Sequence, residues 1–138
     1  MINARADTVA TKPAFRAAFK KRRCLIPADG FYEWKGEKGA KQPYHIGLKT
    51  GEPFAFAGLW EYWKSPEDEP VLSCSIITTE ANELMSELHD RMPVILAPDE
   101  RDVWLDLEVE SDALQELLDP FPSNELPGRQ QVREQRAE

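Results

Sequence analysis

The stretch "FAFAGLWEYW" at residues 54–63 does most to set the fold. It is followed by the turn-forming segment "SPEDEP" (65–70) and by a second apolar, β-branched run, "LSCSIITT" (72–79). Two runs rich in strand-forming residues on either side of a Pro- and acid-rich turn predict two neighbouring antiparallel strands.

Similar strand-like runs lie on both sides of this pair. They are "CLIPADGFYEWK" (24–35), "PYHIGL" (43–48) and "RMPVIL" (91–96), and the turn-formers "GEKGAKQ" (36–42) and "KTGEP" (49–53) separate them. The pattern predicts an α+β fold with a mixed, mainly antiparallel β architecture and helices at its periphery.

Four short segments have helical features. Thr11 can cap a helix with Pro13 in its first turn, and Phe15, Ala18 and Phe19 then share a face. We expect a second helix over 78–90, with Thr79 as its cap and His89 at its end. Shorter ones are expected from Asp99 to Trp104 and over 111–118. We predict one domain at 1–120 and, because few apolar residues follow Pro120, a disordered tail at 121–138.

Charge is distributed unevenly along the 138 residues. The chain has a net charge of −8, but residues 1–64 hold 12 Lys/Arg against 6 Asp/Glu, and the remainder holds 5 against 19. The first half can therefore face phosphates, whereas the overall acidity can equally serve solubility in a salty cytoplasm. Within the basic half, we expect the cluster of Arg16 and residues 20–23 to be solvated helix surface.

Several protein classes find no support in the sequence. No apolar run approaches the roughly 18 residues of a membrane span, and no secretory signal follows Met1, so we expect a cytoplasmic protein. Cys24 and Cys74 lack the spacing of a disulfide framework or a zinc site and are expected to be buried free thiols. There is no Gly-rich phosphate loop, GxSxG or HExxH motif.

Two ionisable residues are candidates for acid–base chemistry. Glu33 lies between aromatic residues in "DGFYEWK", where burial would raise its pKa; the alternative is an exposed glutamate on a half-buried strand. His89, followed by Asp90 and Arg91, suits proton transfer beside a cation, although a histidine at a helix end is also favoured by the helix dipole alone. His45 has no acidic neighbour and is expected to be structural.

Five blocks, in order along the chain, together resemble one known family. They are "NARADT" (3–8), "KPAFRAAFKKRRCLIPADGFYEW" (12–34), "FAFAGLWE" (54–61), "IITTEAN" (76–82) and "HDRMPVIL" (89–96). The chain resembles the SRAP family, the SOS response-associated peptidases, which are also described as abasic-site processing proteins.

This resemblance implies a covalent shield for DNA damage in the SOS response. Family members expose an N-terminal cysteine by removing the leading methionine. Its α-amine and thiol then attack the aldehyde of an abasic site in single-stranded DNA and form a thiazolidine crosslink. By resemblance, Asn3, Glu33 and His89 would be catalytic, Arg5 and Arg91 would bind phosphates, and Trp34 would pack near the site. No cofactor, metal or membrane partner is implied, and a monomer is expected.

The chain also departs from the family pattern. It begins Met1-Ile2 rather than Met-Cys, and its last residues do not reproduce the family's C-terminal motif. Cys24 cannot replace the nucleophile because an internal cysteine has no free α-amine. We therefore expect little crosslinking by these residues alone, and the alternatives are a noncovalent module that binds single-stranded DNA or an inactive remnant.

Overall fold

The computed structural model describes residues 2–36, 39, 42–126 and 130–131. Its larger sheet has the strand order β1 (Ile2–Arg5), β6 (Pro70–Glu80), β5 (Phe54–Lys64), β2 (Arg23–Ala28). The short strands β7 (Arg91–Pro93) and β8 (Ile95–Leu96) pair with β6 and β5. Apart from β1, which runs parallel to β6, the pairings are antiparallel, so the predicted α+β, mainly antiparallel architecture is confirmed.

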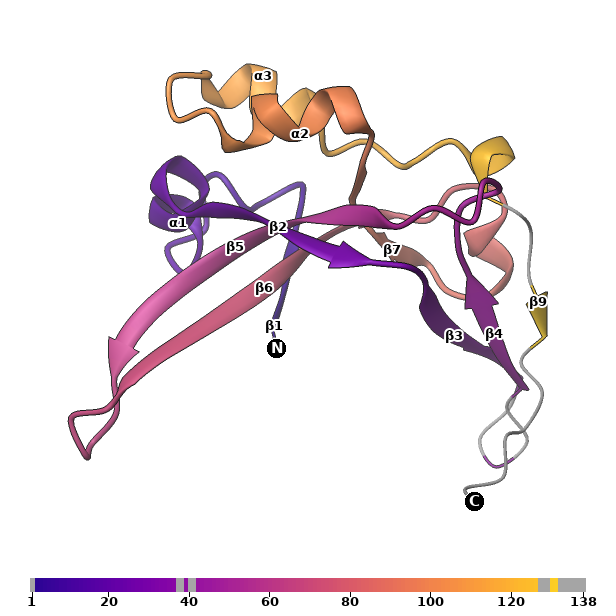
Figure 1. Ribbon diagram of the computed structural model, residues 1–138, viewed down its shortest axis with the longest axis horizontal. Coiled ribbons are helices and arrows are strands. Elements are labelled where there is room, and N and C mark those ends of the chain that lie inside the picture. The colour runs from indigo at the N-terminus through magenta and orange to yellow at the C-terminus, as the bar shows by residue number, and fades with distance from the viewer. Residues whose placement is uncertain (1, 37–38, 40–41, 127–129, 132–138) are drawn as a thin grey trace.

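A smaller sheet consists of β3 (Phe31–Lys35), β4 (Gln42–Ile46) and β9 (Gln130–Gln131). In Figure 1 the β5–β6 hairpin and the β3–β4 hairpin form two diverging arms, and β1 descends between them. The helices lie on the other side of the larger sheet, above the arms in this view. We call the side between the arms the concave face.

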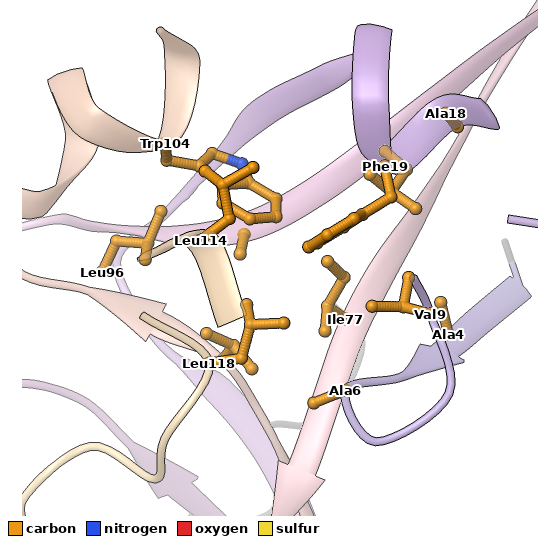
Figure 2. Packing of buried hydrophobic residues seen from close by; sticks show 13 residues of the cluster. Ala4, Ala6, Val9, Ala18, Phe19, Ile77, Leu96, Trp104, Leu114 and Leu118 are labelled. Carbon is orange, nitrogen blue, oxygen red and sulfur yellow. The ribbon is translucent and has the colours of Figure 1, made fainter. Parts of the chain in front are cut away.

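The helices are α1 (Arg16–Lys21), α2 (Pro98–Leu105) and α3 (Ser111–Glu116), with two 3₁₀ turns, η1 (Met85–Glu87) and η2 (Ser123–Glu125). Trp104 on α2, Leu114 on α3, and Ala18 and Phe19 on α1 pack with Ile77 of β6 in the helix-side core (Figure 2). The rings of Phe19 and Trp104 meet edge to face with their centroids 5.9 Å apart. Such aromatic pairs contribute beyond their buried area.

A second core lies on the opposite face of the larger sheet, between it and the smaller sheet. Phe31 of β3 meets Phe54 and Phe56 of β5 edge to face, with centroids 6.5 and 5.9 Å away. Because β5 is covered on both faces, residues 54–59 are all buried. This explains why "FAFAGL" is apolar almost throughout instead of alternating.

One predicted helix is absent, and another begins later than predicted. The segment 78–90 is not an α-helix, since β6 continues to Glu80 and only η1 follows. Pairing of Thr78, Thr79 and Glu80 with β7 replaces the local helical bonds. The first helix begins at Arg16 rather than after Thr11, because Thr8 to Phe15 form successive turns. The helices expected at 99–104 and 111–118 are present as α2 and α3.

The structure describes part of the segment predicted to be a tail. Phe121 and Leu126 are buried in the second core, and Asn82 donates a hydrogen bond to the carbonyl of Phe121 over 2.7 Å. Residues 127–129 and 132–138 lie outside the described residues. The domain division and the disordered tail therefore stay predictions.

Candidate functional site

Alternation along β1 places Asn3 and Arg5 on the concave face. Ala4 and Ala6 are buried in the helix-side core, so Asn3 and Arg5, which alternate with them along the chain, point the opposite way. The register pairs Asn3 with Ile76 and Arg5 with Thr78, and Ile76 packs against the second core. Both predicted residues therefore lie on the concave side of the larger sheet.

Glu33 faces the same side from the smaller sheet. It shares a strand face with Phe31, whose ring packs in the second core, and its own side chain is half-buried. Burial raises the pKa of the Glu33 carboxyl, and the nearby His89 opposes this rise. Of the two alternatives for Glu33, the structure has the half-buried carboxyl rather than an exposed one. The structure also brings Glu33 within electrostatic range of His89, although the two are far apart in sequence.

His89 lies in the turn between η1 and β7. Its Nδ1 is 3.0 Å from the backbone N–H of Arg91 and 3.1 Å from a carboxylate oxygen of Asp90. Neutral Nδ1 accepts the Arg91 N–H, whereas protonated Nδ1 pairs with Asp90, so the two contacts belong to different protonation states. Either way a neighbour holds Nδ1, while half of the ring surface remains exposed.

Arg91 is anchored at one end of its guanidinium. Its Nη2 donates to the carbonyl of Thr78 over 2.7 Å and lies 3.3 Å from the Thr78 hydroxyl. Its Nε is buried and has no hydrogen-bond partner among the described residues. A buried donor without a partner is uncommon and costs free energy. The Arg91 guanidinium is thus held at Nη2 by Thr78, and the fold leaves its Nε donor unpaired among the described residues.

Arg5 and Asp7 form a charged pair close to this arginine. The Arg5 guanidinium donates from Nε and Nη2 to both carboxylate oxygens of Asp7, over 3.1 and 3.2 Å. The hydrogen bond from Arg5 lowers the pKa of Asp7, with a smaller contribution from Arg91. The same bond raises the pKa of Arg5, with a smaller contribution from Asp90. Arginines and carboxylates thus alternate at this end of the sheet.

An open groove of about 570 Å³ lies over this charged set. Both arginines line it, whereas Asn3, Glu33 and His89 are not among its lining residues. The described residues that form it are Arg5, Ala6, Asp7, Thr79, Glu80, Asp90, Arg91, Gln115, Leu118 and Asp119.

Trp34 lies on the face of β3 opposite Glu33. Its ring is 51% exposed, and its centroid is 6.5 Å from that of Tyr32, which is 54% exposed. His45 packs edge to face on Tyr32 at 5.2 Å. A Cβ at Gly30 would lie 2.1 Å from Nε2 of His45, so only glycine fits beside the ring. These contacts agree with the structural role expected for His45.

The other sequence candidates have structural roles or none assigned. Cys24 and Cys74 are free thiols as expected, although half-buried rather than buried, and burial raises the pKa of Cys24. Arg22 pairs with Glu61 over 2.7 Å. Arg23 is buried, so the expectation that the whole basic cluster is solvated is wrong for this residue. Its guanidinium instead binds backbone carbonyls at the ends of α1 and α2.

Sequence reasoning missed two residues of the site. Thr78 anchors Arg91 across a strand pairing that no local pattern reveals. Asp7 could have been found, because a carboxylate two residues after Arg5 at the end of a strand can reach back to it.

Neither a membrane-spanning helix nor a metal-binding cluster is found among the residues that the structure describes. No helix among the described residues is long and apolar enough to cross a membrane. Within the same residues, no cluster of three or more His, Cys, Asp or Glu side chains has an arrangement that could hold a metal ion.

The two sheets of this α+β fold and its polar concave face are those of one class of protein, the SRAP proteins. Residues 1–134 match the family described as SOS response associated peptidase (SRAP), and the chain belongs to this family. It is 48% identical over 132 residues to the abasic site processing protein YoqW of Bacillus subtilis, covering 94% of this chain and 59% of YoqW. It is 36% identical over 140 residues to the abasic site processing protein HMCES of Xenopus tropicalis, covering 86% and 42%.

Solved structures show the same fold. A Bacteroides thetaiotaomicron protein superimposes with a TM-score of 0.90 at 35% identity, covering 96% of this chain and 58% of that one. A Bordetella bronchiseptica protein has a TM-score of 0.84 at 29% identity. This chain spans about 59% of the length of YoqW and less of HMCES.

Proposed function

We propose that this chain is an abasic-site processing domain that binds single-stranded DNA on its concave face and supplies acid–base side chains to the reaction. The observation that carries the proposal is the position of two ionisable side chains. Glu33 is half-buried on β3 of the smaller sheet, and His89, in the turn before β7 of the larger sheet, lies within electrostatic range of it. Membership of the SRAP family and the names of YoqW and HMCES support the choice of substrate.

The ring-opened abasic sugar carries an aldehyde. When an amine condenses with it, a proton leaves the nitrogen and another joins the departing hydroxyl, which is released as water. A carboxyl group with a raised pKa and an imidazole both transfer protons near neutral pH. We assign Glu33 and His89 to these two transfers, and Asn3 to positioning the nucleophile.

Arg5 and Arg91 are assigned to the phosphates that flank the abasic site. Arg91 is already oriented by Thr78, and Arg5 by Asp7, so less side-chain entropy is lost when phosphate binds. We assign the phosphates to these two guanidinium groups and not to the groove as a whole, because Asp7, Glu80, Asp90 and Asp119 also line it. Trp34 is exposed beside Tyr32 on the face of β3 opposite Glu33. We therefore assign it to stacking on a base that the DNA strand carries past the edge of the smaller sheet, outside the concave face.

The nucleophile is assigned to an N-terminal cysteine, by resemblance to the family. A thiazolidine needs an amine and a thiol on the same residue, whereas Cys24 and Cys74 are internal. We therefore expect the 138 residues alone to bind abasic DNA without forming a stable covalent adduct.

The test uses a single-stranded oligonucleotide with one abasic site, followed by denaturing electrophoresis. We expect no band that survives boiling in detergent for this chain alone. A band is expected once the part of YoqW outside the matched region is fused to it with an N-terminal cysteine, and Glu33→Gln or His89→Ala should slow its formation. A stable adduct with the unfused chain, or unchanged rates in both variants, would contradict the assignment.

A noncovalent single-stranded DNA-binding module is the second candidate. The exposed pair Tyr32 and Trp34, with ring centroids 6.5 Å apart, favours it because stacking on aromatics tolerates any base. Anisotropy titrations separate the two functions. Equal affinity for abasic and intact oligonucleotides would support the module, whereas preference for the abasic site supports processing.

A further inference from the structure

The β5–β6 hairpin carries exposed apolar side chains beyond the body of the protein. We call residues 60–74 the arm; in Figure 1 it extends away from the helices. Trp60, Tyr62 and Leu72 are 38, 51 and 72% exposed. The register pairs Tyr62 with Leu72 and Trp60 with Cys74, so these side chains form one apolar strip on one face of the arm.

This strip lies on the concave face. Leu59 is buried in the helix-side core, so Trp60 and Tyr62 point to the other side of β5. Asn3 and Arg5 face the same side from β1. The candidate site and the apolar strip are therefore parts of one continuous surface of the larger sheet.

The arm also has open edges. β2 pairs with β5 only from Phe54 to Leu59, and β1 pairs with β6 only from Ser75 to Thr78. Among the described residues, 70–74 of β6 therefore have no strand on their outer edge. An isolated two-stranded hairpin is marginally stable in water, and an open edge is a template for another strand.

The charges of the arm indicate what covers it. Its tip carries Glu67, Asp68 and Glu69, and Lys64 pairs with Asp68 over 3.4 Å. This excess of carboxylates disfavours the phosphates of a nucleic acid and favours a polypeptide with basic residues at that end. Relatives of this chain have additional polypeptide outside the match, since the match covers 59% of YoqW and 58% of the Bacteroides thetaiotaomicron structure.

We propose that the arm is the docking surface for an extended polypeptide segment, which pairs with residues 70–74 of β6 in line with β1 and covers Trp60, Tyr62 and Leu72. Backbone hydrogen bonds along the strand give affinity, and the apolar strip selects alternate side chains of the segment. The segment carries apolar residues toward the strip and basic residues toward the tip. Because the strip and the candidate site share one face, the docked segment lies beside that site.

The test needs no DNA, so its outcome is independent of the proposed function. The probe is the part of YoqW outside the matched region, made as a separate polypeptide and titrated into the full chain by calorimetry. Hydrogen exchange then locates the contact. We expect micromolar affinity, with slowed exchange in residues 60–64 and 70–74.

Matched variants make the test specific. The double variant Tyr62→Ser with Leu72→Ser should weaken binding at least tenfold. Leu107→Ser should leave it unchanged, because Leu107 is 65% exposed but lies between α2 and α3. Circular dichroism checks that each variant is folded. Absence of binding, equal affinity of the double variant, or protection only outside the arm would overturn the proposal.

Two other occupants give distinct results. A second copy would protect the arm without the probe and raise the sedimentation coefficient with concentration. A nucleic acid would protect it when an intact single-stranded oligonucleotide is added. Either result would overturn the proposal, whereas arm protection that depends on the YoqW polypeptide supports it.

Discussion

Arg23 and Arg91 belong to the same sheet and bind in opposite ways. Arg23 donates to the carbonyls of Phe19, Lys20, Trp104 and Asp106, and its guanidinium lies 5.6 Å from the centre of the Trp104 ring. Arg91 binds Thr78 and leaves Nε without a partner among the described residues. The donors of the Arg23 guanidinium are thus occupied by backbone carbonyls of the fold, whereas Arg91 has one donor that the described residues leave unpaired.

The same contrast extends to the surroundings of the two residues. On the helix side, Trp104 is fully buried and its indole N–H donates to the carbonyl of Cys24 over 2.9 Å. On the concave side, charged residues and exposed aromatic rings share the surface. Packing on the helix side stabilises the fold. The concave side keeps exposed polar and charged groups, which lower stability, as is common in binding sites.

Replacing Arg23 with alanine should have the largest effect. The substitution leaves several carbonyls at the ends of α1 and α2 without their donor in a buried place, which costs about 3 kcal/mol or more. Urea denaturation measures the loss. Arg16→Ala, an exposed cation of α1, is the control and should change the free energy of unfolding by less than about 0.5 kcal/mol. Similar losses in both variants would remove the distinction between structural and surface arginines.

Replacing Arg91 with alanine should act on binding more than on folding. Loss of one phosphate contact weakens single-stranded DNA binding about equally for all sequences and reduces the slope of log affinity against log salt by about 1. The lost bond to Thr78 costs about 1 kcal/mol of stability. Lys12→Ala, an exposed cation outside the groove, should leave the slope unchanged. An unchanged slope in Arg91→Ala would assign this arginine to the fold, like Arg23.

Sequence reasoning reached the sheet more securely than the helices or the site. The 54–79 strand pair was predictable because its residues favour strands and its turn is explicit. The 78–90 segment was not, since pairing with β7 overrides a locally helical pattern. In "KKRR" nothing local distinguishes Arg23 from its solvated neighbours, because its burial depends on carbonyls more than 80 residues away.

The site was predictable in parts only. Local pattern left Glu33 as either an exposed glutamate or a carboxyl whose pKa burial would raise, and the structure has it half-buried with a raised pKa. Its proximity to His89 depends on the arrangement of two sheets, which family resemblance suggested but no local spacing could establish. The catalytic and DNA-binding roles of these residues stay predictions.

Replacing Glu33 with glutamine should have the smallest effect on stability, and its sign depends on pH. Burial raises the pKa of Glu33 in the folded state above the unfolded value of about 4.3, so the fold favours the protonated carboxyl. Below about pH 4.3 both states are protonated and the wild type has no ionisation cost. As pH rises through the folded pKa, this advantage of the protonated form is lost and the wild type falls below Glu33→Gln in stability. The difference in stability between the two proteins then becomes constant.

Urea denaturation between pH 4 and 8 measures this difference, with exposed Glu83→Gln as the control. A Glu33→Gln variant that is less stable than the wild type at neutral pH would show that attraction to His89 outweighs burial. The carboxylate would then be part of a stabilising ion pair rather than a group held ready for proton transfer.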